Sequence, residues 1–326
     1  METMKNKPTI FVTRRWPAKA EAALSQYFTP TFNQSDTPLS PDELAAGFAS
    51  HDALAPTVSD SVDADIIAAG AGGTGRLVAN FGVGVNHIDL AAARQAGIAI
   101  SNTPGVLTDA TADLALTLIL MLTRRAGEGE RELRAGHWQG WGPTHLVGQS
   151  LQGKTLGIIG MGRIGKAVAH RAALGFGMKI VFSNRSRITD ITGYPAQQMD
   201  DIDAVCRVAD ILSLHCAATP ETMHILNADR LAMMQPHACV INTARGDVVD
   251  EAALAKALHA GQIGGAGLDV YQNEPDIAPL LLAAPNTVLL PHLGSATSET
   301  RTAMGLKVVE NARAFFAGDA LIDPVV

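Results

Sequence analysis

Short apolar runs alternate with alanine-rich amphipathic stretches along the first hundred residues of the chain. The apolar runs have the length of strands and lie at 9–13, 53–55, 77–80 and 98–100, whereas helical patterns cover 19–27, 63–69 and 89–96. Strand patterns that alternate with helical patterns indicate βαβ units, which build parallel sheets. The pattern therefore predicts an α/β domain at residues 1–102.

A second series of apolar runs follows the turn at Asn102-Thr103-Pro104-Gly105 and a long predicted helix that ends near Arg125. Its strand-like runs lie at 156–159, 179–182, 211–214, 238–242, 265–269 and 287–290, with helical stretches between most of them. Six strands with crossover helices predict a doubly wound parallel sheet at 103–292. A last helix at about 298–317 can return the chain, so residues 293–326 are assigned to the first domain. We expect two Rossmann-like or flavodoxin-like domains with the active site in the cleft between them.

Composition and charge restrict the class of protein. The chain has 326 residues, of which 47% are hydrophobic and 17% are charged. This composition is typical of a folded protein, and the length suits two domains of the common size of about 150 residues. The net charge is −7 and no lysine or arginine run occurs. We therefore expect neither nucleic acid nor a membrane surface as a partner.

The cysteines and the apolar segments point to the cytoplasm. Cys206, Cys216 and Cys239 are odd in number and lack paired spacing, which argues against a disulfide framework and against a zinc site, so no metal is expected. The start of the chain shows no signal-peptide pattern. The most apolar run, 114–122, is far shorter than the roughly 20 residues that span a bilayer.

The strongest chemical motif is Gly160-Met161-Gly162-Arg163-Ile164-Gly165, which follows one predicted strand and opens a predicted helix. Gly160 permits a tight turn, Gly162 lets the backbone approach a pyrophosphate, and Gly165 lets helix and strand pack closely. The helix N-terminus attracts the phosphate charge. A bare glycine pattern would also fit an ordinary turn, but this context predicts a dinucleotide site.

The residues after the second strand of this unit bear on which dinucleotide binds. Asn184 occupies the position where NAD-binding units usually present an acid to the ribose hydroxyls. The sequence Asn184-Arg185-Ser186-Arg187 instead supplies two guanidinium groups and short polar side chains, which suit a 2′-phosphate. We therefore expect a preference for NADP(H). The alternative is that both arginines are solvated and that NAD(H) binds.

Three polar residues follow later predicted strands and can carry the reaction. Arg245, Glu274 and His292 all emerge at the carboxyl-end rim of the predicted sheet, where doubly wound sheets bind ligands. Arg245 can hold a carboxylate and polarise a neighbouring carbonyl oxygen. His292 can donate a proton to that oxygen, and Glu274 would favour the charged imidazole. Taken singly, each also has a structural explanation: a surface ion pair, a loop carboxylate and a packed residue beside Pro291.

Together these motifs resemble the D-isomer-specific 2-hydroxyacid dehydrogenases over nearly the whole chain. The matching stretches are 80–89, 102–108, the glycine loop, 242–246, 267–275 and 291–295. The resemblance implies that Arg245, Glu274 and His292 form the family's catalytic triad. It further implies a set of binding residues: Val83, Gly84 and Ser295 for the substrate, and Thr111, Cys216, Ala217, Thr243, Asp269 and Gly294 for the cofactor. Ala217 is a departure, because the family often has a proline there, lining the adenine pocket.

Within the family, three segments are most similar to the glyoxylate and hydroxypyruvate reductases: 138–141, 184–187 and 292–297. This implies NADPH-dependent reduction of glyoxylate to glycolate and of hydroxypyruvate to D-glycerate. It also implies a homodimer in which residues 126–150 form the dimerisation segment and Trp141 reaches the partner's active site. The alternative for the tryptophans is local core packing. Two alternative functions stay open: an NAD-linked dehydrogenase for a larger D-2-hydroxy acid, and a nicotinamide-sensing, corepressor-like binding protein.

Overall fold

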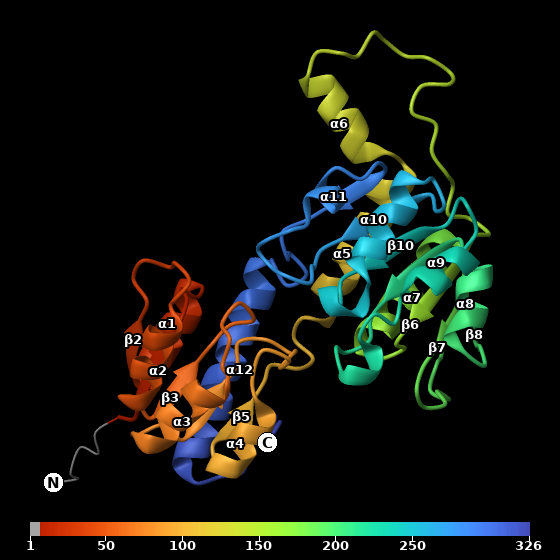
Figure 1. Cartoon of the computed structure of the whole chain (residues 1–326). Helices are drawn as coiled ribbons and strands as arrows, with labels where there is room; N and C mark the ends of the chain where they lie inside the picture. Colours follow the sequence, from red (N-terminus) through yellow and green to blue (C-terminus); the bar gives the residue numbers. More distant parts are fainter. Residues whose placement is uncertain (1–6) are drawn as a thin grey trace, which may run out of the picture. The chain divides into compact units, whose positions relative to one another are not determined.

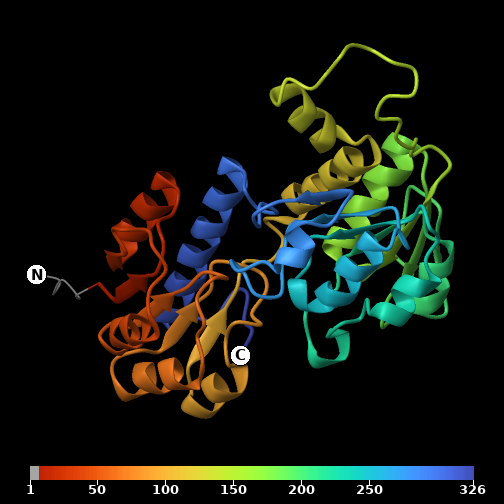
Figure 2. The same cartoon turned by 45° about the horizontal axis from the view of Figure 1, so that its top comes forward.

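The computed structural model describes residues 7–326 and divides into two compact units. Unit 2 is Thr108–Ser295; unit 1 comprises the described residues up to Leu107 and the segment Ala296–Val326. The change from one unit to the other lies a few residues after the boundaries that the sequence suggested at 102 and 292. Figures 1 and 2 show the chain in two orientations, coloured from red at the N-terminus to blue at the C-terminus.

Unit 1 is built on a five-stranded parallel sheet with the strand order β2-β1-β3-β4-β5. The strands are β1 (Thr9–Val12), β2 (Thr29–Phe32), β3 (Ala53–Ala55), β4 (Leu77–Ala79) and β5 (Ala99–Ser101). The helices are α1 (Ala18–Tyr27), α2 (Pro41–Ala49), α3 (Ala64–Gly72), α4 (Leu90–Ala96) and α12 (Ser298–Ala317). Helix α12, blue in Figure 1, packs against α1 within unit 1.

Two elements of unit 1 were absent from the predicted pattern. Strand β2 is an edge strand with no fully buried residue and a proline, Pro30, so it lacks the apolar alternation of a buried strand. Ser40 is the N-cap residue of helix α2 and forms a capping box with Glu43. The helix buries Leu44 and Phe48. The capping sequence was a readable helix-start signal that the periodicity analysis missed.

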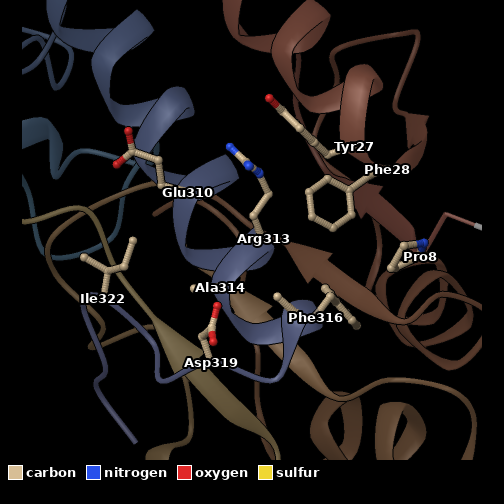
Figure 3. Close-up of a pocket in the computed structure, with 10 residues that line it drawn as sticks. Pro8, Tyr27, Phe28, Glu310, Arg313, Ala314, Phe316, Asp319 and Ile322 are labelled. Atoms are coloured by element: carbon tan, nitrogen blue, oxygen red, sulfur yellow. The ribbon is translucent and has the colours of Figure 1, made fainter.

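A shallow groove lies beside α1 and α12 in unit 1. Its volume is about 520 Å³, and Tyr27, Phe28, Arg313 and Phe316 are among the residues that line it. Figure 3 shows the Arg313 guanidinium turned toward Tyr27; the guanidinium carbon lies 3.8 Å from the ring centroid. Since Arg313 stacks on an aromatic face of its own unit, this contact ties the end of α1 to α12.

Unit 2 contains a seven-stranded parallel sheet with the order β12-β11-β10-β9-β6-β7-β8. The strands are β6 (Thr155–Ile159), β7 (Lys179–Ser183), β8 (Ala196–Gln198), β9 (Ile211–Leu214), β10 (Cys239–Asn242), β11 (Gly265–Leu268) and β12 (Thr287–Leu289). The helices are α5 (Thr108–Thr123), α6 (Ala126–Arg134), α7 (Arg163–Phe176), α8 (Ile202–Val208), α9 (Ala228–Met233), α10 (Glu251–His259) and α11 (Pro279–Leu282), with short 3₁₀ turns η1 (Pro220–Thr222) and η2 (Gly246–Val248).

The prediction of six strands in unit 2 was wrong by one, because β8 was missed. Its sequence, Ala-Gln-Gln, has no apolar alternation, and it pairs with one neighbour only, at the edge of the sheet. The inner strands β9, β10 and β11 are buried at every position, which is why their apolar runs were readable. The doubly wound fold itself is confirmed.

Helix α6 and the loop that follows it leave the body of unit 2, as the yellow-green segment in Figures 1 and 2 shows. No residue of α6 is buried among the described part of the chain. Trp138 is 52% exposed and Trp141 is 86% exposed. The alternative of local core packing is therefore wrong for both tryptophans. Elsewhere, no helix within residues 7–326 is both long and apolar enough to cross a membrane.

Candidate active site

The glycine loop joins β6 to α7, and the surroundings of its three glycines differ. Gly160 has φ +94°, a left-handed conformation that favours glycine. A Cβ atom on Gly165 would lie 2.3 Å from the Gly160 carbonyl oxygen, so a side chain there would disrupt the packing of helix and strand. A Cβ atom on Gly162 would meet no atom within 4 Å. Gly162 is thus dispensable for packing within the described chain, unlike Gly165.

Gly162 is also the N-cap of α7, and no side chain accepts a hydrogen bond from the first turn of that helix. The N–H groups of a first helical turn lack partners inside the helix and attract anions. Arg163, in that first turn, is exposed, and Ile164 is half-buried. A helix N-terminus without a capping side chain, next to a glycine with open space around it, suits the pyrophosphate of a dinucleotide.

The end of β7 lies against this loop. The Met161 N–H donates to Asn184 Oδ1 at 3.1 Å, and Asn184 Nδ2 donates to Ser186 Oγ at 3.1 Å. Asn184 therefore braces the glycine loop. Arg185 and Arg187 are exposed, and neither forms a hydrogen bond or salt bridge with another described residue. Their guanidinium groups are available to a ligand at this edge of the sheet.

Arg245, Glu274 and His292 follow the neighbouring strands β10, β11 and β12. Because the strands are parallel, their carboxyl ends share one edge of the sheet. His292 Nδ1 lies 2.7 Å from Glu274 Oε2. The Tyr271 N–H donates to Glu274 Oε1 at 2.9 Å, which fixes the other oxygen. The imidazole is thus held through Nδ1, so that Nε2 remains for a ligand.

Electrostatic effects couple the three groups. Burial raises the pKa of Glu274, but the hydrogen bond and the charge of His292 outweigh burial and hold this pKa below its usual value. Burial lowers the pKa of Arg245, while the carboxylates of Glu274 and Asp247 oppose that effect. The carboxylate of Glu274 therefore interacts electrostatically with both Arg245 and His292, and the predicted triad is brought together in unit 2.

A second carboxylate, Asp269, holds the turn that carries His292. The N–H groups of Leu293 and Gly294 donate to its two oxygens at 2.6 and 2.8 Å, and its own carbonyl accepts from the His292 N–H at 2.9 Å. His292 has φ +54°, which is uncommon for a residue with a side chain. Burial raises the pKa of Asp269 to about 6. Asp269 thus fixes an otherwise unfavourable backbone conformation.

The remaining residues predicted for the cofactor lie around the same edge. Thr111 Oγ1 donates to the Gly294 carbonyl at 3.1 Å, which brings Thr111, Asp269 and Gly294 together. Cys216 follows β9 and lies against the glycine loop, since a Cβ atom on Gly160 would come within 2.6 Å of its nitrogen. Burial raises the pKa of Cys216 to about 11, so it is a neutral thiol. Ala217 comes next in this loop, and Ser295 is half-buried after Gly294.

The sequence analysis missed His215, which lies directly after β9. Its Nε2 is 2.8 Å from Ser213 Oγ, and its Nδ1 is 3.5 Å from Oγ1 of Thr243, another predicted cofactor residue. Burial lowers the pKa of His215 to about 4, so the ring is neutral at physiological pH. A polar residue after an apolar strand was the signal that singled out Arg245 and His292, and it could have singled out His215 as well.

Val83 and Gly84 belong to unit 1, in the loop after β4. Among residues 7–326, no group of three or more histidine, cysteine or acidic side chains is arranged to hold a metal ion. Cys206, Cys216 and Cys239 are all free thiols.

Comparison with known proteins identifies the family. Residues 116–294 match the family described as D-isomer specific 2-hydroxyacid dehydrogenase, NAD binding domain. Glyoxylate reductase of Thermococcus litoralis is 40% identical over 317 residues, which cover 96% of this chain and 95% of that protein. Glyoxylate reductase of Korarchaeum cryptofilum is 40% identical over 316 residues, covering 96% and 94%.

A solved structure agrees. The NADPH-dependent glyoxylate/hydroxypyruvate reductase of Sinorhizobium meliloti, in complex with NADP and malonate, superposes with a TM-score of 0.85 at 34% identity, covering 98% of this chain and 97% of that one. Both the sequence and the fold are therefore shared along nearly the whole chain. The chain belongs to the D-isomer-specific 2-hydroxyacid dehydrogenase family, whose members use a nicotinamide cofactor.

Proposed function

We propose that the protein reduces small 2-oxo acids, glyoxylate and hydroxypyruvate, to glycolate and D-glycerate with NADPH. The observation that carries the proposal is the pair of His292 Nδ1 and Glu274 Oε2, 2.7 Å apart, next to Arg245. Both curated relatives described above are glyoxylate reductases, and the Sinorhizobium meliloti relative is an NADPH-dependent glyoxylate/hydroxypyruvate reductase. The triad of this chain and these names support the same substrate class.

The residues of unit 2 divide the chemistry between them. A bound nicotinamide supplies the hydride. Arg245 pairs with the substrate carboxylate and polarises the adjacent carbonyl oxygen, which orients the acceptor carbon. His292 donates the proton from Nε2 to that oxygen. Glu274 holds the ring through Nδ1 and stabilises its charged form.

The loop after β4 supports the predicted role of Val83 and Gly84 as the site of the substrate carboxylate. The Gly82 carbonyl accepts from Thr103 N at 3.0 Å, and the Val83 carbonyl accepts from Asn102 Nδ2 at 2.8 Å. In a trans peptide the carbonyl oxygen and the next N–H point in opposite directions. The N–H groups of Val83 and Gly84 therefore point away from these donors, and neither donates to another described residue. Two such N–H groups suit a carboxylate.

The proposal of NADPH rather than NADH rests on the loop at the end of β7. Asn184 stands where an acid would repel a 2′-phosphate, and Arg185 and Arg187 are exposed beside it. A phosphate carries close to two negative charges at neutral pH and pairs well with guanidinium groups. Arg163, the first residue of α7 and part of the glycine motif, is a third exposed arginine.

We further propose a homodimer formed through residues 126–150, in a cytoplasmic protein. Leu133, Trp138, Trp141 and Val147 are all more than half exposed in this segment. Exposed aromatic and aliphatic side chains concentrated in one extended segment are typical of a subunit interface. Trp141, at 86% exposure, is the residue proposed to reach the partner's active site.

The test is a matrix of steady-state rates. Glyoxylate, hydroxypyruvate, pyruvate and phenylpyruvate are each assayed with NADPH and with NADH. The proposal predicts the highest kcat/KM for glyoxylate or hydroxypyruvate with NADPH. A preference for phenylpyruvate with NADH would favour a dehydrogenase for a larger hydroxy acid, and binding of the cofactor without turnover on any acid would favour a sensing protein.

A further inference from the structure

The last residues of the chain extend the sheet of unit 1. Val325 N donates to the Ile100 carbonyl at 2.8 Å, and Ile100 N donates to the Val326 carbonyl at 3.2 Å. Ser101 and Pro324 form an antiparallel bridge. Since β5 is otherwise the edge strand of this sheet, residues 323–326 cover its open side. We refer to residues 323–326 as the C-terminal strap.

The strap is fastened to α12 through Asp323. Asn311, which is fully buried, donates from Nδ2 to Asp323 Oδ2 at 2.9 Å and accepts from the Asp323 N–H at 2.8 Å. Lys307 Nζ lies 3.0 Å from Asp323 Oδ2, and both side chains are mostly buried, at 18% and 14% exposure. The carbonyl of Asp323 then accepts from the Asn102 N–H at 3.3 Å. Asp323 therefore connects α12 directly to Asn102.

Asn102 in turn holds the loop proposed to bind the substrate carboxylate. Its Nδ2 donates to the Val83 carbonyl at 2.8 Å. The carbonyl of Val83 and the N–H of Gly84 belong to one peptide group, so this bond fixes the direction of the Gly84 N–H. Asn80 Nδ2 holds the flanking carbonyls of Gly82 and Gly84 at 3.1 and 3.0 Å. Asn102 is the side chain that holds the central peptide of the loop.

The far end of the strap reaches the same loop by packing. Val325 and Val326 pack on the hydrophobic cluster that contains Ile88 and Ile100, and Val85 packs on this cluster too. Val85 directly follows Gly84. The strap and the loop thus share a hydrogen-bonded connection through Asn102 and an apolar connection through the cluster.

We infer that Asn102 is a positioning residue for the substrate carboxylate, held in place by the C-terminal strap. The inference rests on the proposed function. A peptide between Val83 and Gly84 that loses its anchor can rotate, because glycine on one side allows a wide range of backbone angles. Rotation moves the Gly84 N–H out of line with the carboxylate. The effect falls on the affinity for the 2-oxo acid rather than on the chemistry of Arg245 and His292 in unit 2.

The first test compares Asn102→Ala with Asn102→Asp. Loss of one hydrogen bond to an uncharged carbonyl predicts a rise of about fivefold in the KM for glyoxylate with Asn102→Ala. Asn102→Asp keeps the size of the side chain but turns an acceptor toward the Val83 carbonyl, so its KM should rise at least as far. In both variants, kcat and the Kd for NADPH should stay within twofold of wild type.

The matched control is Asn33→Ala in the same unit. Like Asn102 Nδ2, which donates to one backbone carbonyl, Asn33 Nδ2 donates to backbone carbonyls, in this case those of both Thr13 and Thr37, at 2.9 and 2.7 Å. This variant should lower the melting temperature as Asn102→Ala does, without raising the KM for glyoxylate. A purely structural role of Asn102 would give the two variants the same kinetics, which would overturn the inference.

The second test acts on the strap. Asp323→Ala and removal of residues 324–326 should each raise the KM for glyoxylate in the same direction as Asn102→Ala, with NADPH binding retained. Asp323→Ala keeps the chain length and serves if the shortened chain does not fold. If the wild type is active and the KM for glyoxylate is unchanged in Asn102→Ala and Asp323→Ala, the inference is overturned but the proposed function is not. A wild type inactive on every 2-oxo acid overturns the proposed function, and the inference with it.

Discussion

The pair of Glu274 and His292 allows one substitution to test the electrostatics of the site. Glu274→Gln keeps the shape of the side chain and, with its amide oxygen toward the ring, a hydrogen bond to His292 Nδ1. It removes the negative charge that lies 2.7 Å from the ring and turns an NH2 group toward the Tyr271 N–H. The charged imidazole is the form that donates the proton. Without the carboxylate this donor form loses a stabilising neighbour, so proton donation should be slower.

The size of the effect follows from the geometry of the pair. Hydrogen bonds to charged groups contribute about 1.5–3 kcal/mol. The two side chains are 29% and 34% exposed, so solvent screens the pair and the lower value applies. About 1.4 kcal/mol corresponds to a factor of ten. We therefore expect kcat/KM for glyoxylate to fall about tenfold.

The assay is the kcat/KM for glyoxylate with saturating NADPH at neutral pH. Asp210→Asn is the matched control, because His237 Nε2 and Asp210 Oδ1 form a similar pair, 2.6 Å apart, before β9 and β10 at the opposite edge of the same sheet. The control should be less stable, with its kcat/KM unchanged. An unchanged kcat/KM in Glu274→Gln would refute the assigned role of the carboxylate.

Three further predictions concern the cofactor site, stability in acid and assembly. Gly162→Ala should fold with wild-type stability but bind NADPH more weakly, whereas Gly165→Ala, whose Cβ would lie 2.3 Å from the Gly160 carbonyl oxygen, should lose about 1–3 kcal/mol in urea unfolding; equal stability of the two variants would contradict this reasoning. Because the pKa of Glu274 is lowered in the folded protein, this group stabilises the fold at pH values above its unfolded pKa, which is near 4.5. That stabilisation is lost as the pH falls through the lower pKa of the folded state. The melting temperature of Glu274→Gln should therefore fall less steeply in acid than that of wild type. Trp141→Ser should weaken the dimer in sedimentation equilibrium and lower kcat/KM; a variant that assembles and turns over like wild type would remove Trp141 from the interface.

The sequence specified the unit 2 sheet and the residues along its edge because two strong signals coincide there. Fully buried parallel strands give continuous apolar runs, and the polar residues that end them, such as Arg245 and His292, stand out from that background. Edge strands lack this signal, which explains why β2 and β8 were not predicted.

Other features depend on contacts between residues far apart in the chain. The bonds from Asp269 to the turn after His292 and from Asp323 to Asn102 join residues separated by more than twenty positions. No local pattern encodes such pairs. The left-handed conformation of His292 was equally unreadable, because φ above zero is expected of glycine rather than histidine.

The central claim is that His292 is the proton donor in the reduction of a small 2-oxo acid by NADPH. The most direct measurement is the initial rate of NADPH oxidation with glyoxylate by wild type and by His292→Ala, together with the Kd for NADPH. The account predicts a loss of about a hundredfold or more in kcat, with NADPH binding changed only slightly. Turnover of His292→Ala at the wild-type rate would contradict it.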